Sequence, residues 1–534
     1  MSTYLCYDIR GIQQSIFAVP RLKYIVGGSS LIDAFDREGV DKIAKGTGAE
    51  KIFAGGGRGT FFCKDAGCAA NLSRQIRDGI HRIGLEARIG QGASPVEAAQ
   101  NFVTFALPME NLSGEPCAVS GLFPVDAGAK GAAGASIHPF MRIRAEHAGT
   151  DRVGREILGL ASREPDFPAE LRDLFQSNRD SVVFMRSVNP DIDDDAQSQQ
   201  IARRGQIALG SRNRWALIAM DGNNIGMQHQ AAKERYRGDA DAHRGWLLAM
   251  SGAIDRSARS AVASALAGAV SAWWQTAGRS QSGSAPVVLP FRPLIAGGDD
   301  VLLLSHCSYA MDIVKCVCRK FSEFAGKESA AFGGGGLWLA TAGQLTISAG
   351  VLYLPVTFPI ASAIAYTESL LGSAKGRSRQ VPAGTAAPAS VDWESITEGA
   401  IDSPAERRNR ELRFLDGDDP ETEVILTYRP WLVSELCQHL DPLKDRLADL
   451  PVSIRHELLP ILRQGCWERM RGLARIRKNY SRIFDDLNYR PGAACGPGWK
   501  KESRETGGFT LRTCYNDALL LLAEEHRMKQ RTAK

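Results

Sequence analysis

Two segments of the 534-residue chain follow the same plan, and this repeat restricts the possible folds most strongly. The first copy has an apolar run that ends near Asp8 and a glycine-rich turn in residues 51–63, "KIFAGGGRGTFFC". The second copy has an apolar run that ends at Asp221 and a glycine-rich turn in residues 292–305, "RPLIAGGDDVLLLS". In each copy we expect a strand that delivers an aspartate to its carboxyl end, then a helix and a hairpin with a glycine tip.

The residues after the second glycine turn complete a known order of elements. Residues 307–325 and 360–379 have helical apolar spacing, and residues 345–359 alternate like a strand. Strand, helix, hairpin, helix and strand is the order of a ferredoxin-like palm. We therefore predict an α+β protein with two ferredoxin-like palm domains of the nucleotide cyclase and polymerase kind, followed by a C-terminal α-helical domain. The predicted boundaries are 1–107 for a first palm with a non-catalytic tip, 108–210 for an inter-palm linker or insert, 211–385 for a second, catalytic palm, and 386–534 for a linker and the helical domain.

Asp299 and Asp300 stand side by side between two apolar runs. Like charges at this spacing repel, and burial strengthens the repulsion, so we expect a cation between them. Asp221, on the neighbouring strand, completes a minimal set of three carboxylates. Mg²⁺ and Mn²⁺ prefer such oxygen ligands, and nucleotidyl transfer commonly uses two ions about 4 Å apart. We predict all three aspartates as catalytic residues and metal ligands; an aspartate-rich, solvated hairpin turn is the alternative.

Five further residues are predicted to contact the nucleotide. Gly297 and Gly298 form a turn at which the backbone can approach a ligand closely. Gly222 and Asn224 lie in "DGNNIG", where backbone amides at the start of a helix can cradle phosphates. Lys375 can balance the charge of a triphosphate, although a lysine near a helix C-terminus needs no ligand.

The first copy differs from the second at its tip. Its turn reads "GGGRG" and carries no acid. Asp8 occupies the place of Asp221, so we expect a structural role or a contact with an acceptor nucleotide for Asp8, not catalysis.

Composition excludes several classes of protein. The chain is 44% hydrophobic and 23% charged with a net charge of +5, which is typical of a soluble globular protein and is weak evidence for a nucleic-acid partner. We expect no membrane association, because no apolar run approaches the length of about 20 residues that spans a bilayer. The N-terminus lacks the pattern of a signal peptide, and the eleven cysteines fit reduced thiols. A cytoplasmic location is expected, and no zinc site is assigned.

The motifs resemble those of a known family, the large polymerase-like subunit of type III CRISPR effector complexes. More distantly, the second palm resembles the diguanylate cyclase domain, which has a GGDEF-type tip. The motifs that carry the resemblance are "DIRGIQQSIF" and "VGGSSLIDAF" in the first palm, "MDGNNIG", "LIAGGDDVLLLS" and "ISAGVLYLPVTFPIASAIAYTESLLGSAK" in the second, and "LTYRPWLVSEL" in the C-terminal part.

The resemblance implies a nucleotidyltransferase that converts ATP to cyclic oligoadenylates when the complex recognises target RNA. One ATP would bind in each palm, and the 3′-hydroxyl of the first would attack the α-phosphate of the second. Asp299 and Asp300 would hold the two Mg²⁺ or Mn²⁺ ions together with Asp221. The implied partners are other subunits of the ribonucleoprotein, guide RNA and target RNA.

The sequence also departs from the family pattern. Relatives often carry an acid where Asn223 stands, and many have an N-terminal HD nuclease domain, whereas this chain has no His-Asp dipeptide. We therefore expect a variant without that nuclease. Two alternatives stay open: a stand-alone, defence-associated nucleotide cyclase that binds no guide RNA, and a catalytically silent scaffold subunit of the complex.

Overall fold

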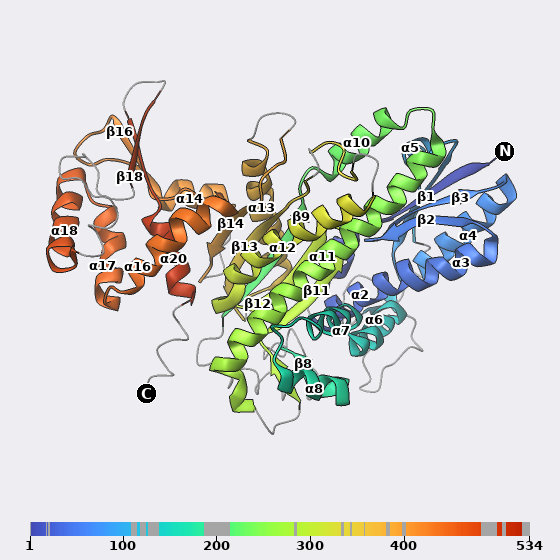
Figure 1. The fold of residues 1–534 in the computed structure, drawn as a ribbon, viewed down its shortest axis with the longest axis horizontal. Coiled ribbons are helices and arrows are strands. Elements are labelled where there is room, and N and C mark those ends of the chain that lie inside the picture. The colour runs from blue at the N-terminus through green and yellow to red at the C-terminus, as the bar shows by residue number, and fades with distance from the viewer. Residues whose placement is uncertain are drawn as a thin grey trace.

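The computed structural model has an α+β architecture, as predicted (Figure 1). It describes residues 2–17, 19, 22–107, 115–117, 124–125, 138–185, 214–281, 286–332, 336–341, 344–356, 358–380, 385–397, 402–481, 499–504 and 509–525. In this part of the chain, no helix is both long enough and apolar enough to cross a membrane.

The first palm is a five-stranded sheet in the order β2-β3-β1-β4-β5. The β2–β3 hairpin pairs with the first strand, which in turn pairs with β4, and this is the ferredoxin-like order. The strands are β1 (Thr3–Arg10), β2 (Glu50–Gly55), β3 (Arg58–Cys63), β4 (Glu86–Gly92) and β5 (Val103–Phe105). The helical elements are α1 (Ile12–Phe17), α2 (Leu22–Ala34), the π-helical turn η1 (Phe35–Gly39), α3 (Val40–Thr47), α4 (Ala66–Arg82) and α5 (Pro95–Gln100).

Helix α4 shows how the sequence builds this domain. Asp65 caps its start, because the carboxylate accepts a hydrogen bond from the Cys68 backbone amide at 2.8 Å. Leu72, Ile76 and Ile80 recur at four-residue spacing, and each is fully buried. This apolar stripe fixes α4 against the sheet.

The second palm repeats the topology in a six-stranded sheet with the order β11-β12-β9-β13-β14-β17. Its hairpin, first strand and fourth strand take the same places as in the first palm. The strands are β9 (Arg214–Gly222), β11 (Phe291–Gly297), β12 (Asp300–His306), β13 (Ile347–Pro355), β14 (Ser390–Ser395) and β17 (Trp431–Leu432). The helices are α10 (Ile225–Arg235), α11 (Ala240–Thr276), α12 (Ala310–Phe332) with the short turn η4 (Cys307–Tyr309) before it, and α13 (Ile360–Ser378).

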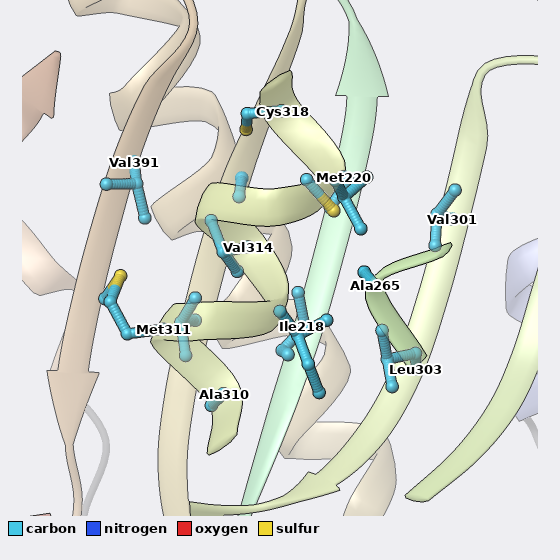
Figure 2. Packing of buried hydrophobic residues seen from close by; sticks show 14 of the residues in the cluster. Ile218, Met220, Ala265, Val301, Leu303, Ala310, Met311, Val314, Cys318 and Val391 are labelled. Atoms are coloured by element: carbon cyan, nitrogen blue, oxygen red, sulfur yellow. The ribbon is translucent and has the colours of Figure 1, made fainter. Parts of the chain in front are cut away.

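Strand β9 lies at the centre of the core and is buried on both faces. Ile218 and Met220 face α12, where they meet Met311 and Val314 (Figure 2). Leu217 on the other face belongs to the cluster that includes residues of α13. Burial of both faces explains why residues 214–220 read as a nearly continuous apolar run.

The second palm extends past the predicted boundary at residue 385. Residues 390–395 were expected in a linker, but they form β14, which pairs in parallel with β13. Trp393 is fully buried there. The proline and alanine residues before β14 suggested a linker, and the six-residue strand after them is too short to show a clear period.

The C-terminal part contains the helices that we predicted and also a four-stranded sheet that we did not. The sheet has the order β15-β16-β19-β18, with the parallel pair β16 and β19 at its centre. Its strands are β15 (Arg413–Leu415), β16 (Thr422–Ile425), β18 (Trp499–Ser503) and β19 (Phe509–Thr513). The helical elements are α14 (Pro404–Glu411), α15 (Val433–Glu435), η5 (Leu436–Leu440), α16 (Asp441–Ala448), α17 (Val452–Leu462), α18 (Cys466–Asn479) and α20 (Tyr515–Glu525).

The segment between the palms packs against both of them. Helix α6 (Pro139–Thr150) contacts α2 of the first palm, and α7 (Arg152–Ala161) contacts α11 of the second. The remaining described elements of this segment are β6 (Glu115–Pro116), β7 (Pro124–Val125), α8 (Ala169–Ser177), η2 (Arg179–Ser181) and β8 (Val182–Phe184). Strand β8 pairs with β10 (Val287–Leu289). The short turn η3 (Gly278–Gln281) follows α11.

The two palms contact each other reciprocally. Helix α11 of the second palm packs against β2 of the first, and α2 of the first palm packs against β11 of the second. Figure 1 shows α11 crossing in front of the second palm toward the strands of the first. Each hairpin is therefore supported by a helix of the other palm.

Candidate functional site

The glycine turn of the second palm is a two-residue hairpin loop. Gly297 pairs with Asp300, which leaves Gly298 and Asp299 as the loop residues. Gly298 has φ of 61°, a conformation that a residue without a Cβ adopts at little cost. A Cβ added to Gly297 or Gly298 would meet no atom within 4 Å, so this face of the turn is open to a ligand.

Asp221 and Asp299 meet beside this turn. Asp221 is the penultimate residue of β9, and its carboxyl lies beside that of Asp299. Burial and the neighbouring Asp221 carboxyl raise the pKa of Asp299 to about 8. Gly222 makes the contact possible, because a Cβ at this position would lie 3.0 Å from the Cβ of Asp299.

Asp300 lies next to this pair but keeps one side open to solvent. The surrounding protein and the Asp221 charge raise its pKa to about 6, whereas Lys375 and Arg58 act in the opposite direction. The predicted site residues of β9 and of the turn are thus brought together.

Lys375 forms an ion pair with Asp221 and therefore belongs to the site. It lies on α13, two turns after Glu368, so both side chains are on the same face of the helix. Glu368 contributes to the electrostatic environment of Asp300, and its own pKa is raised by burial. The sequence analysis missed Glu368, although its seven-residue spacing from Lys375 was a usable signal.

The two asparagines after Asp221 have different roles. Asn224 has φ of 61° and starts α10, which places the helix amides behind the end of β9. The side-chain amide of Asn223 donates hydrogen bonds to Thr346 Oγ1 at 2.8 Å and to Ser348 Oγ at 2.9 Å. Asn223 is buried in this polar network. Asn223, which stands where relatives often have an acid, is thus hydrogen-bonded to two hydroxyl groups of the second palm.

The first palm carries the opposite charge at the matching position. Arg58 pairs with Gly55 across the turn, as Asp300 does with Gly297, and Gly56 and Gly57 have φ of 63° and 79°. Asp8 Oδ1 is 2.8 Å from Arg58 Nε, and Asp8 Oδ2 is 3.3 Å from Arg88 Nη1. Two guanidinium groups therefore already compensate the Asp8 carboxylate.

The donor chemistry of the site fits divalent cations, and metal binding by Asp221, Asp299 and Asp300 stays a prediction. Asp221 and Asp299 lie side by side and supply hard oxygen ligands, and the raised pKa of Asp299 is what an ion of charge +2 would relieve. Among the described residues, however, no group of three or more His, Cys, Asp or Glu side chains is arranged to hold a metal ion. In this arrangement Lys375 pairs with the Asp221 carboxylate.

Comparison with known proteins identifies the second palm. Residues 214–381 match the family model of the Cas10/Cmr2 second palm domain. None of the curated proteins matches the chain. Solved structures that match include the Csm1–Csm4 cassette in complex with cA3 (15% identity, TM-score 0.37, 70% of this chain and 53% of that chain), the same cassette in complex with AMPPNP (14%, 0.40, 86% and 63%), and Csm1 in T. onnurineus (14%, 0.38, 86% and 61%). The chain thus spans 53% to 63% of the length of these solved chains.

Proposed function

We propose, from the match of residues 214–381 to the family model of the Cas10/Cmr2 second palm domain, that the chain is a metal-dependent nucleotidyltransferase. Its reaction is the conversion of ATP to cyclic oligoadenylates within a type III CRISPR RNA-guided defence complex. Its partners in that complex are the other protein subunits, guide RNA and target RNA. The observation that carries the proposal is the contact of Asp221 with Asp299 at an open glycine turn.

The reaction requires one bond to form and one to break. The 3′-hydroxyl oxygen of an acceptor nucleotide bonds to the α-phosphorus of a donor ATP, and the bond from that phosphorus to the bridging oxygen breaks. Pyrophosphate leaves with the electron pair, and the hydroxyl proton passes to a nearby base or to water. Bound Mg²⁺ or Mn²⁺, held by Asp221, Asp299 and Asp300, would supply charge for the triphosphate and acidify the attacking hydroxyl.

The residues of the chain have distinct tasks in this proposal. Gly297 and Gly298 leave room for the triphosphate beside the turn. Lys375 pairs with Asp221, and it would bind a phosphate oxygen once cations occupy that carboxylate. Asp299 and Asp300 must lose their protons to bind cations, so cation binding and deprotonation are coupled at this site.

The direct test is product formation by the protein with both turn aspartates replaced. Purified chain, alone and in its complex with target RNA, is incubated with ATP and Mg²⁺ or Mn²⁺, and the products are identified by mass spectrometry. We expect cyclic oligoadenylates from the wild type and none from the Asp299→Ala/Asp300→Ala variant. Asp241→Ala, which removes a carboxylate with a side chain that is 87% exposed on α11, is the control and should retain the activity.

Two outcomes separate this proposal from its alternatives. Equal product from the wild type and the double variant would remove the catalytic assignment, and absence of product from both would favour a silent scaffold. RNA recovered with the purified protein and sequenced distinguishes a complex-bound cyclase from a stand-alone one.

A further inference from the structure

Each hairpin turn is held by an aspartate on a helical element of its own palm. The Gly57 amide donates a hydrogen bond to Asp36 Oδ2 at 2.6 Å, and the Gly298 amide donates one to Asp255 Oδ1 at 3.2 Å. Asp36 lies in η1, and Asp255 lies on α11. Each palm therefore fixes one amide of its turn with an aspartate, at the second loop residue in the first palm and at the first loop residue in the second.

The aspartate of the second palm is also bound from the first palm. Arg37 Nη2 is 3.4 Å from Asp255 Oδ2, and Arg37 follows Asp36 in the same π-helical turn. Two adjacent residues of η1 thus reach both turns. Asp36 contacts Gly57 directly, and Arg37 reaches Gly298 through Asp255.

These contacts belong to a cluster of ion pairs, which we call the interpalm cluster and which comprises Asp33, Arg37, Glu156, Asp255 and Arg259. Both arginines contact all three acids. Arg259 is 3.0 Å from Asp255, 2.9 Å from Asp33 and 2.9 Å from Glu156. Arg37 is 3.0 Å from Asp33 and 3.2 Å from Glu156.

The interpalm cluster joins the first palm, the inter-palm segment and the second palm at one point. The Arg259 side chain is only 5% exposed, so its charge depends on the three carboxylates around it. The side chains of Arg37, Glu156 and Asp255 are about one third exposed, whereas those of Asp33 and Arg259 are mostly buried. Loss of an acid from the cluster therefore leaves mainly the Arg259 charge uncompensated. Arg37 therefore links η1 to Asp255 directly, through a contact of 3.4 Å.

We propose that Asp36, Arg37 and Asp255 couple the two glycine turns, so that the position of the first turn sets the position of the second. They are positioning residues, because they contact the turn backbones and one another. The functional consequence rests on the proposed function: a nucleotide that displaces the turn of the first palm moves Gly298 and the adjacent Asp299. An acceptor nucleotide in one palm thereby aligns the acids that act on the donor nucleotide in the other.

Hydrogen exchange of the full-length protein tests this coupling without any turnover. The measured quantity is the exchange rate of the amides in residues 295–301, which include the second turn. Asp255→Ala should speed the exchange of the Gly298 amide about fivefold, the change expected for one hydrogen bond of ordinary net strength. Arg37→Gln should speed it about twofold, although Arg37 belongs to the other palm.

Arg256→Gln is a matched control. Arg256 follows Asp255 on α11 and forms a two-point ion pair with Glu328, at 2.9 and 2.6 Å, that contacts neither turn. This variant should leave the exchange of the second turn unchanged. Thermal unfolding of each variant shows whether the chain is still folded.

A double variant separates coupling from a general loss of stability. Asp36→Asn weakens the hold on Gly57, and we expect it to speed exchange in residues 295–301 when Arg37 is present but not in an Arg37→Gln background. Unchanged exchange of the second turn in Arg37→Gln, or an equal response to Asp36→Asn in both backgrounds, would overturn the proposal. An inactive wild type would count only against the proposed function, because exchange is measured without ATP.

Discussion

Arg58 and Asp300 occupy matching places in the two hairpins, as Gly57 and Asp299 do, and these two differences give the turns opposite charges. In the first palm Arg58 and Arg88 compensate Asp8, so the carboxylate has no need of a cation. In the second palm Asp299 and Asp300 have raised pKa values, because Asp221 lies beside them and the protein surrounds them. The binding of divalent cations that we propose is thus confined to the second of the two palms.

The buried carboxyl of Asp36 predicts a pH dependence of the stability of the protein. Burial raises its pKa to about 7 from a usual value of 3.8, despite hydrogen bonds from Tyr7 and Gly57. Between pH 3.8 and about pH 7, Asp36 is protonated in the folded protein but ionised in the unfolded chain. The stability that this group contributes is therefore full below about pH 4 and is lost as the pH rises through 7.

Asp36→Asn should remove this pH dependence. We expect the free energy of unfolding of the wild type minus that of the variant to be larger at pH 5 than at pH 8, by on the order of 2 kcal/mol. Denaturant unfolding at the two pH values measures the difference. An identical difference at both pH values would show that Asp36 is ionised throughout.

Among the elements, α13 positions one side of the site through a close contact with β13. A Cβ at Gly350 would lie 2.5 Å from backbone atoms of both Thr367 and Leu371, so the helix approaches the strand as closely as a glycine allows. This contact places Lys375 beside Asp221. The sheet and the helix therefore determine the position of the lysine together.

Two alanine substitutions test this contact. Gly350→Ala should lower the free energy of unfolding by about 2 kcal/mol or more, because backbone must move to admit the methyl group. Gly372→Ala on α13 itself has no atom within 4 Å of its added Cβ, and it should be neutral or stabilising by up to about 1 kcal/mol. Chemical denaturation compares the two, and similar effects from both would contradict the close packing.

The sequence predicted the elements with strong patterns better than those whose partners are distant. The apolar run of β9, the glycine turns and the helical spacing of α13 indicated the second palm correctly. Strand β14 was missed because it depends on pairing with β13, and the four-stranded C-terminal sheet was missed because its strands have only three to five residues each. Short strands carry too little periodicity to be distinguished from loops.

In the whole molecule, the duplicated palms pack against each other through α11 and β2 and through α2 and β11. Arg58 of the first turn is near enough to act on the pKa of Asp300 in the second. The repeat was visible in the sequence, and so were Asp221, Asp299 and Asp300. Asp255 and the interpalm cluster were not, because their members come from four elements spread over more than two hundred residues and form no motif. Only the packing of one palm on the other brings those charges together.

The most direct test of the central claim is Mn²⁺ binding by the intact protein. Electron paramagnetic resonance counts the ions bound in the presence of a non-hydrolysable ATP analogue, for the wild type and for the Asp299→Ala/Asp300→Ala variant. We predict Mn²⁺ bound with the nucleotide in the wild type and lost in the variant, whose thermal unfolding should be almost unchanged. Equal Mn²⁺ binding by the two proteins would contradict the claim that these aspartates form the cation site.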